Sequence, residues 1–509
     1  MSEGYLLGID LGTSSLKGSL LNLQNHDILT ESVELAVSYP NSFSAEQDPH
    51  EWWKGFKNLI GKLKRQLGSF DSLRAIGLSG QMLGLVILDE NGQPIRPSLI
   101  WCDQRSFQEV ETLKTELGTE RLLSDTANTP LTGYWLPKIM WLKRNEPSHL
   151  QKTFKMLLPK DYLRFHLTGA FVTDVSDASG TMLFDVSKRK WSRDILDYLS
   201  LDERLLPEVV ESTAVTGYIT EKAARETGLP AGIPVVGGGG DQSSGGIGLG
   251  VIQRGIVSCV LGTSGVVMAQ TDEVKIDTEN RGLHSFCYSV EGKWFLMGCT
   301  LAAGGSYQWL HNALKPLIPA VTYDDLNRLA GETDPGAKGL LFLPYLIGER
   351  TPHSDPSARG GFFGLSHQHD LRHLVRAVIE GVAFSQRESV EILKSFGLVA
   401  HRIIVSGGAA RSPLWCQTMS DVIHLPVVTT NIDDPASVGA AIIAGVGSKA
   451  FGSFEDGCHQ FIHTLDLVNP RLNNQALYDT LFEKYKELYQ SLKSNFRDIS
   501  LLQESMMNK

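Results

Sequence analysis

The chain has 509 residues, of which 42% are hydrophobic, so it can bury more than one core and is expected to form two or three domains. Its formal net charge is −10 and it has no long run of lysine or arginine, which argues against nucleic acid or an anionic membrane as the main partner. Six cysteines without CxxC spacing favour reduced thiols over a zinc site or a disulfide framework. No apolar stretch approaches the ~20 residues of a membrane span, and the first residues do not form a signal peptide, so a cytoplasmic protein is expected.

The first elements expected along the chain are the strands of a meander. Residues 5 to about 37 contain three such strands, with Asn25-His26-Asp27 at one turn. Residues 52–67 have helical spacing and precede an apolar strand at 75–78. Strands that are followed by helices favour an α/β layered domain.

A second half of the chain is expected after a glycine-rich run. Residues 237–250 separate a strand at 233–236 from a new strand that begins at Gly255. A boundary in this run gives an N-terminal domain at 1–247 and a C-terminal domain at 248–509. Further on, the pattern predicts a long helix at 371–393, a strand at 403–405, a small-residue helix at 435–446 and an amphipathic helix beyond about residue 474.

The tetrapeptide Leu-Gly-Thr-Ser occurs twice, at 11–14 and at 261–264. Each copy continues an apolar strand and precedes another apolar stretch, which predicts a hairpin that turns on Gly-Thr-Ser. Such a turn directs several backbone N–H groups and two hydroxyls to one spot, where they can bind phosphate oxygens. One copy alone is consistent with an ordinary hydroxyl-rich hairpin. Two copies about one domain length apart predict two similarly built halves, each of which brings a phosphate-binding hairpin to one nucleotide.

Two aspartates stand at the ends of predicted strands. Asp10 precedes the first hairpin and is expected to hold Mg²⁺ through water, because magnesium keeps several waters when it is bound. Asp241 follows four glycines at 237–240, which let the backbone approach a ligand closely. It is expected to act as a general base that orients and deprotonates a substrate hydroxyl. The alternative for Asp241 is an N-cap of the following helix.

Two further segments are candidates for ligand contacts. Residues 406–412, Ser-Gly-Gly-Ala-Ala-Arg-Ser, lie between a strand and a helix; they could admit a flat purine against bare backbone or form a tight βα turn. Residues 101–105 combine a tryptophan face with polar groups, which suits a sugar. The alternative there is a partly buried tryptophan beside a surface ion pair. The sequence contains no Walker A lysine motif, HExxH or GxSxG.

The chain resembles the FGGY family of carbohydrate kinases over nearly its whole length, and the xylulokinase branch in particular. The resemblance implies two actin-like (ribonuclease H-like) α/β ATPase domains with a catalytic cleft between them, the sugar lying mainly on the first and ATP largely on the second. The matching segments, in chain order, are 8–14, 79–82, 137–138 with Trp141, 158–163, 174–180, 238–241, 261–265, 284–287, 343–345, 348–353, 358–360, 363–365 and 407–409.

The resemblance also implies roles for individual residues, which add to those derived above. Asp10 matches the magnesium-linked acid of the family, and Asp241 matches the proton acceptor. Met82, Leu83, Asp241 and Gln242 match sugar-contacting positions of the family. Together with Gln81 of the matching segment 79–82, and with Trp101 and Asp103 from the analysis of residues 101–105, they are the expected sugar contacts. Nucleotide contacts are expected from Gly12, Thr13, Ser14, Ser15, Lys17, Gly262, Thr263, Gly304, Gln308, Gly407, Gly408 and Ser412.

The implied activity is ATP-dependent transfer of the γ-phosphate to a primary hydroxyl of a ketose, with D-xylulose as the expected substrate and ATP and Mg²⁺ as cofactors. Xylulokinases usually have histidine where this chain has Leu83, so another ketopentose, a ketohexose or a polyol stays an alternative. An alternative of another class is an actin- or chaperone-like ATPase, or a sugar-responsive protein without turnover. The expected partners are the small sugar and ATP, with no nucleic acid and no membrane, and a homodimer is left open.

Overall fold

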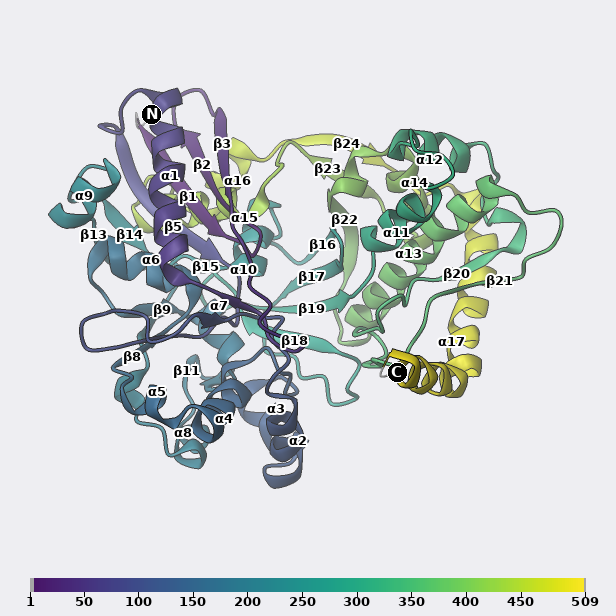
Figure 1. Ribbon diagram of the computed structural model, residues 1–509. Coiled ribbons are helices and arrows are strands. Elements are labelled where there is room, and N and C mark those ends of the chain that lie inside the picture. The colour runs from purple at the N-terminus through teal and green to yellow at the C-terminus, as the bar shows by residue number, and fades with distance from the viewer. Residues whose placement is uncertain (1–3, 508–509) are drawn as a thin grey trace.

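The computed structural model describes residues 4–507. It contains two seven-stranded sheets in separate lobes, and the long C-terminal helix runs along the outer side of the second lobe (Figure 1). Within the described range, no helix is long and apolar enough to cross a membrane.

The first sheet contains both arms of the first predicted hairpin. β1 (Tyr5–Leu11) and β2 (Ser15–Asn22) are antiparallel, and β3 (Ile28–Glu34) completes the expected meander. β5 (Leu73–Gly80) runs parallel to β1 on its other side. The order is β13-β14-β5-β1-β2-β3, and the remaining strands are β13 (Val215–Tyr218), β14 (Pro234–Val236) and β15 (Gly239–Gly240), which pairs with β5.

The second sheet repeats this arrangement. β16 (Gly255–Leu261) and β17 (Gly265–Thr271) form the second predicted hairpin, and β22 (Ala400–Gly407) runs parallel to β16 as β5 does to β1. The order is β18-β19-β17-β16-β22-β23-β24, so the pair of similarly built α/β halves is confirmed. The other strands are β18 (Leu283–Cys287), β19 (Trp294–Thr300), β23 (Val427–Thr430) and β24 (Thr464–Val468).

Helix α1 (Pro49–Leu67) covers one face of the first sheet. Asp48 accepts a hydrogen bond from the His50 N–H, and Pro49 occupies the first turn, so the helix begins slightly before the predicted start at 52. Burying each large apolar side chain of its inner face contributes about 1.5–3 kcal/mol. These side chains are Trp52, Phe56, Leu59, Ile60 and Leu63, which belong to the same core as Leu7, Ile9 and Leu11 of β1.

Two helices of small residues lie between the sheets. α10 (Asp241–Gly248) and α15 (Pro435–Gly447) approach so closely that a Cβ on Gly439 would lie 1.8 Å from the carbonyl oxygen of Ser244. α15 also lies directly on β1, where a Cβ on Gly8 would meet the carbonyl oxygen of Ser437 at 1.8 Å. The helix predicted at 435–446 is therefore confirmed. It covers the first sheet although it comes from the second half of the chain.

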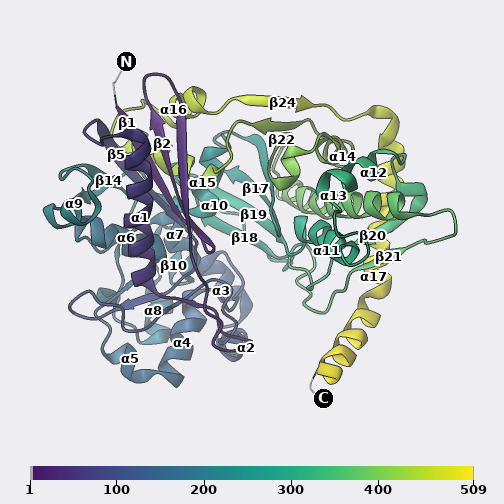
Figure 2. The ribbon, with the colours of Figure 1, turned by 45° about the horizontal axis from the view of Figure 1, so that its top comes forward.

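Much of the chain between residues 81 and 212 forms an additional layer on the first lobe (Figure 2). The edge strand β18 of the second sheet docks on it, because Asn128 Nδ2 donates to the carbonyl oxygen of Ser285 at 2.8 Å and the Ser285 N–H donates back at 3.1 Å. The short strands of the molecule are β4 (Glu46–Gln47), β6 (Val86–Leu88), β7 (Ser98–Leu99), β8 (Lys155–Leu157), β9 (Val172–Asp174), β10 (Phe184–Asp185), β11 (Lys190–Trp191), β12 (Glu208–Val210), β20 (Leu341–Leu343) and β21 (Gly361–Phe363).

The predicted helices of the second half are present with small changes at their ends. The helix expected at 371–393 is α13 (Leu371–Ser395), and the tail forms α17 (Leu472–Met507). The other helices are α2 (Phe107–Glu116), α3 (Thr119–Thr126), α4 (Trp135–Asn145), α5 (Pro147–Gln151), α6 (Pro159–Thr168), α7 (Val175–Ala178), α8 (Arg193–Leu199), α9 (Glu221–Thr227), α11 (Gly304–Leu314), α12 (Tyr323–Gly331), α14 (Pro413–Ile423) and α16 (Phe454–Phe461). Short 3₁₀ turns span Ser179–Thr181, Glu203–Leu205, Ala337–Gly339 and Gly408–Arg411.

Candidate active site

The carboxyl ends of three adjoining strands bring many of the predicted residues together. β1 ends at Leu11, which pairs with Gly80 at the end of β5, and Gly80 pairs in turn with Gly240 at the end of β15. The first hairpin, the loop at 81–83 and Asp241 therefore leave the sheet side by side. In open α/β sheets, this edge is where ligands usually bind.

A closed ring of hydrogen bonds ties the first hairpin to the neighbouring loop. Thr13 Oγ1 donates to Gln81 Oε1 at 3.1 Å, and Gln81 Nε2 donates to Gln47 Oε1 at 2.7 Å. Gln47 Nε2 returns to the carbonyl oxygen of Thr13 at 2.8 Å. The oxygen and the nitrogen of the buried Gln81 amide are both hydrogen-bonded to other residues of the protein. This arrangement favours a role in supporting the hairpin over the expected contact with the sugar. Gln47 has no sequence motif that marks it for this role.

Asp10 lies beneath the first hairpin and is 8% exposed. Its Oδ1 accepts a hydrogen bond from Ser79 Oγ at 3.0 Å, while Oδ2 accepts none from residues 4–507 and lies 3.7 Å from where a Cβ of Gly12 would be. Burial, followed by the charges of Asp434 and Asp241, raises the pKa of Asp10 to about 8. A nearby cation would oppose that shift, so a buried carboxylate with one free oxygen here fits a divalent metal ion.

Lys17 lies beside a further buried carboxylate that the sequence analysis did not identify. Lys17 Nζ is 3.6 Å from Asp434 Oδ1, and Asp434 Oδ2 accepts from Ser437 Oγ at 2.9 Å. The adjacent Asp433 pairs at 3.2 Å with Arg411 of the second lobe. These two acids therefore connect the strand of the first hairpin to the second lobe.

Asp241 is the first residue of α10, and Gly240 occupies the N-cap position, so the alternative N-cap role is not seen. The glycines before it are required by space: Gly238 has a φ of 67°, and a Cβ on Gly240 would lie 2.6 Å from Met82 Cγ. Burial raises the pKa of Asp241 to about 6, although hydrogen bonds from Gln242 partly offset this effect by lowering the pKa. Such a carboxylate is ionised at neutral pH and can accept a proton.

Met82 and Leu83 form the loop that lies next to this glycine run. Leu83 has a φ of 71°, a conformation that is rare for leucine. The buried Lys138 holds the loop, because its Nζ donates to the carbonyl oxygens of Leu83 at 2.8 Å and Leu99 at 3.0 Å. The side chain of Leu83 packs on Gly180, where a Cβ would lie 2.6 Å from Leu83 Cδ2.

Trp101 and Asp103, which were both expected to contact the sugar, occupy different environments. Trp101 is 42% exposed and donates from Nε1 to Thr13 Oγ1 of the first hairpin at 2.9 Å. Asp103 is fully buried; it accepts from the Ala45 N–H at 2.7 Å and pairs with Arg105 at 2.8 Å. The ion pair beside Trp101 is thus buried, and Asp103 supports the loop that carries the tryptophan.

The second lobe has a cavity of about 390 Å³ at the tip of the second hairpin. The hairpin is joined there to the start of α11, since the N–H groups of Gly304 and Gly305 donate to the carbonyl oxygens of Gly262 and Thr263 at 2.9 Å each. The segment 408–412 forms the tight turn predicted between a strand and a helix. Its residues Gly408, Ala409, Arg411 and Ser412 also line the same cavity. Of the predicted nucleotide contacts, the lining includes Gly262, Thr263, Gly304, Gln308, Gly408 and Ser412.

Aromatic side chains that the sequence analysis missed form one wall of this cavity. Tyr307 stacks on Tyr323 with ring centroids 5.8 Å apart and meets Trp415 edge-on at 5.3 Å. The hydroxyl of Tyr307 donates to Asn327 Oδ1 at 2.8 Å. Flat aromatic surfaces favour stacking of a nucleobase. The wall could not be read from the sequence because α11, α12 and α14 each contribute to it.

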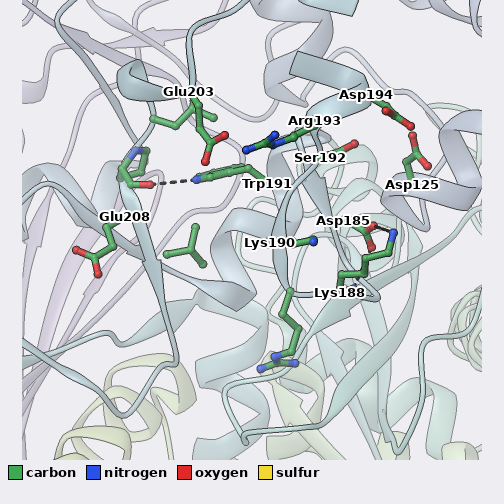
Figure 3. A pocket seen from close by; sticks show the side chains of 14 residues that line it. Asp125, Asp185, Lys188, Lys190, Trp191, Ser192, Arg193, Asp194, Glu203 and Glu208 are labelled. Atoms are coloured by element: carbon green, nitrogen blue, oxygen red, sulfur yellow. Dashed lines mark hydrogen bonds and ion pairs between the residues drawn. The ribbon is translucent and has the colours of Figure 1, made fainter. Parts of the chain in front are cut away.

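A larger cavity of about 670 Å³ lies in the additional layer of the first lobe (Figure 3). Both acidic and basic side chains line it, and Figure 3 shows Lys188 paired with Asp185. Trp191 donates from its indole nitrogen to the carbonyl oxygen of Pro207 at 3.1 Å. None of the predicted site residues lines this cavity, so it is separate from the site at the hairpins.

Comparison with known proteins identifies the family. Residues 5–248 match the N-terminal domain of the FGGY family of carbohydrate kinases, and residues 257–448 match its C-terminal domain. The xylulose kinase of Lactococcus lactis subsp. lactis (strain IL1403) is 37% identical over 492 residues, which cover 96% of this chain and 97% of that protein.

Solved structures agree with this result. The crystal structure of a "xyloylose kinase" from Brucella ovis has a TM-score of 0.90 and 33% identity, covering 96% of this chain and 99% of that one. A gluconate kinase from Lactobacillus acidophilus has a TM-score of 0.91 and 26% identity, covering 98% and 100% of the two chains. The chain belongs to the FGGY family of carbohydrate kinases and is a sugar kinase.

Proposed function

We propose that this protein transfers the γ-phosphate of ATP to a primary hydroxyl of a ketose, and that D-xylulose is its substrate and D-xylulose 5-phosphate its product. The xylulose kinase of Lactococcus lactis and the "xyloylose kinase" of Brucella ovis match the chain over nearly its whole length. The observation that carries the proposal is the position of Asp241 beside the first hairpin and the loop at 81–83, at the ends of adjoining strands.

In the proposed reaction, the carboxylate of Asp241 accepts a hydrogen bond from the attacking hydroxyl. The bond between the sugar oxygen and the γ-phosphorus forms as the bond from that phosphorus to the β–γ bridging oxygen breaks, and Asp241 takes the hydroxyl proton. Phosphoryl transfer has a loose transition state, so the proton leaves late and correct positioning supplies most of the rate. Gln242, which follows Asp241, would bind the sugar together with Met82, which lies against Gly240, and Leu83.

The nucleotide would lie between the two hairpins. The cavity bordered by Tyr307, Tyr323 and Trp415 is large enough for a purine, and Tyr323, at 43% exposed, has the most free ring surface of the three for stacking. Thr263 and the N–H groups of the second hairpin would bind phosphate oxygens from one side, and the first hairpin with Lys17 from the other.

Mg²⁺ fits this arrangement, with Asp10 as the residue that would hold it. When bound, the ion neutralises charge on the phosphate oxygens. Among residues 4–507, no three His, Cys, Asp or Glu side chains are placed to bind a metal together, so nucleotide phosphates and water would supply the other ligands. The proposal includes a cytoplasmic location, which the six free cysteines favour.

ADP release with and without added sugar tests the proposal as a whole. A kinase forms ADP only when a sugar acceptor is present, apart from slow hydrolysis. Sugar-independent ADP formation at the full rate would instead support the actin- or chaperone-like alternative, and no ADP under either condition would support a sugar-responsive protein without turnover.

Leu83 is expected to set the preference among sugars. Leucine cannot pair with a sugar hydroxyl, and a hydroxyl left unpaired on burial costs about 1–3 kcal/mol. Leu83→His should therefore change the ratio of kcat/KM between D-xylulose and the next-best acceptor by about tenfold. A coupled ADP assay over pentuloses, hexuloses, polyols and gluconate measures this ratio.

The matched control is Leu83→Met, which keeps an apolar side chain of similar size and should leave the ratio nearly unchanged. The same ratio in Leu83→His and in the unchanged protein would show that the side chain at position 83 does not contact the sugar. Weak turnover of D-xylulose beside strong turnover of another acceptor would replace the proposed substrate.

The rate is expected to depend on the ionisation of Asp241. Only the carboxylate accepts a proton, and burial raises its pKa to about 6, so kcat/KM should be constant above this pH and fall as the pH decreases through it. The measurement is a pH profile of kcat/KM for the sugar at saturating MgATP. An acid limb near pH ~4, where an unperturbed aspartate titrates, would contradict the burial of this group.

A further inference from the structure

We propose that Ser176 is a positioning residue, which holds Asp241 in place through the backbone N–H of Gly240. This inference rests on the function proposed above. It gives a role to two segments, 158–163 and 174–180, that the family resemblance singled out and that no ligand contact described so far explains.

Ser176 connects the glycine run to a buried carboxylate. Its Oγ accepts from the Gly240 N–H at 3.0 Å and donates to Asp174 Oδ2 at 2.5 Å. The same Asp174 oxygen accepts from Ser212 Oγ at 2.9 Å, and Lys160 Nζ lies 3.0 Å from the other oxygen. Ser176, Asp174, Ser212 and Lys160 are fully buried. Turning the Ser176 hydroxyl away would take this acceptor from the buried Gly240 N–H, while Asp174 Oδ2 would keep its hydrogen bonds from Ser212 Oγ and the Ser176 N–H.

Arg164 holds the other end of the glycine run. Its two terminal nitrogens donate to the carbonyl oxygens of Val236 and Gly237, each at 2.6 Å. Arg164 also donates to Asp161 Oδ1 at 3.0 Å, and that oxygen accepts from Lys160 Nζ at 2.7 Å. One continuous network of buried charges therefore contacts the run both before and after its central glycines.

The glycine run needs such a support because it has no side chains of its own to pack. Glycine is the most flexible residue, so the position of Asp241 depends on what binds the backbone of the run, namely the pairing of β15 with β5 and the contacts of Ser176 and Arg164. A base displaced by about 1 Å can cost 10²-fold in rate. Buried ion pairs contribute little net stability, so stability alone does not account for this network. Its contacts with the glycine run that leads to Asp241 favour a role in positioning the base.

Ser176→Ala tests this role by removing the acceptor of the Gly240 N–H. We expect kcat to fall by about 10- to 100-fold, while the KM for ATP and the dissociation constant of ADP stay unchanged, because the aromatic cavity lies in the other lobe. The matched control is Ser212→Ala, which removes a buried hydroxyl from the same Asp174 oxygen without touching Gly240. Its kcat should stay within about twofold of the unchanged protein, since the Ser212 side chain makes no hydrogen bond to the glycine run. The bond of 2.8 Å from the Gly238 N–H goes to the Ser212 carbonyl oxygen, which alanine keeps.

A double-mutant cycle with Asp241→Ala separates positioning from a general structural effect. If Ser176 acts through Asp241, adding Ser176→Ala to Asp241→Ala leaves the residual rate unchanged, because no base remains to be positioned. Additive losses, or equal losses in Ser176→Ala and Ser212→Ala, would overturn the proposal. Near-normal turnover of Asp241→Ala alone would instead contradict the proposed function.

Ser176→Cys is a second variant that tests the same hydrogen bond if the alanine variant does not fold. The thiol is close in size to the hydroxyl and is a weaker acceptor, so an intermediate kcat is expected with a melting temperature near that of the unchanged protein. Full activity in the folded cysteine variant, together with full activity in Ser212→Ala, would show that the hydrogen bond to Gly240 does not position the base.

Discussion

Asp241→Ala is expected to lower sugar-dependent ADP formation by about 10²- to 10⁴-fold, the contribution that a positioned general base makes. The carboxylate stands at the end of β15, next to the first hairpin and to Met82, where an acceptor hydroxyl and the γ-phosphate can meet. Binding of ADP should be retained, because the aromatic cavity that would hold the base is built from the second lobe.

A coupled assay for ADP and calorimetric titration with ADP together measure this result. Asp241→Asn is the matched control: the side chain keeps its size but cannot accept the proton, so it should lose activity to a similar degree. Near-normal turnover in either variant would remove Asp241 from the mechanism, and loss of ADP binding would indicate a wider structural change.

Asp10→Asn is expected to lower kcat by about 10- to 100-fold, the loss typical of residues that act on a metal ion through its outer shell. It should also weaken the effect of Mg²⁺ on ATP binding. The asparagine oxygen can still accept the hydrogen bond from Ser79 that Asp10 Oδ1 accepts. The change therefore removes the negative charge beside Gly12 while it keeps the local packing.

The dissociation constant of ATP, measured by calorimetry over a series of Mg²⁺ concentrations, reports on the ion separately from activity. Asp434→Asn is the matched control, because Asp434 is as buried as Asp10, at 8% exposed, but pairs with Ser437 and lies near Lys17. An unchanged Mg²⁺ dependence in Asp10→Asn would show that another group holds the metal.

The two hairpins could be predicted because each is a local structure. Strand propensity on both sides of Gly-Thr-Ser determines the turn, and no distant contact is needed to form it. Their repetition in one chain also predicted the duplicated sheet, which has the same order of strands around β1 as around β16. Asp241 was predicted at a strand-to-helix turn, but its place at the same edge as the first hairpin follows from the pairing of β15 with β5.

Side-chain directions within the site could not be predicted in the same way. Gln81 and Asp103 stand in segments that lie at the site, yet their polar groups bond to Gln47, Thr13, Ala45 and Arg105. Whether a polar side chain faces a ligand or a neighbour depends on which segments pack around it, and these segments are far apart in the sequence. Whether Gln81 contacts the sugar stays a prediction.

Local patterns in the amino-acid sequence determined the hairpins, the long amphipathic helices, the duplicated α/β plan and the positions of Asp10 and Asp241, because turn and helix signals extend over only a few neighbouring residues. The tertiary structure decided what depends on contacts between distant segments. It brought Tyr307, Tyr323 and Trp415 to one cavity, and it placed α15 of the second half on the first sheet. It also put a buried ion network behind the glycines, where the hydroxyl of Ser176 meets the N–H of Gly240.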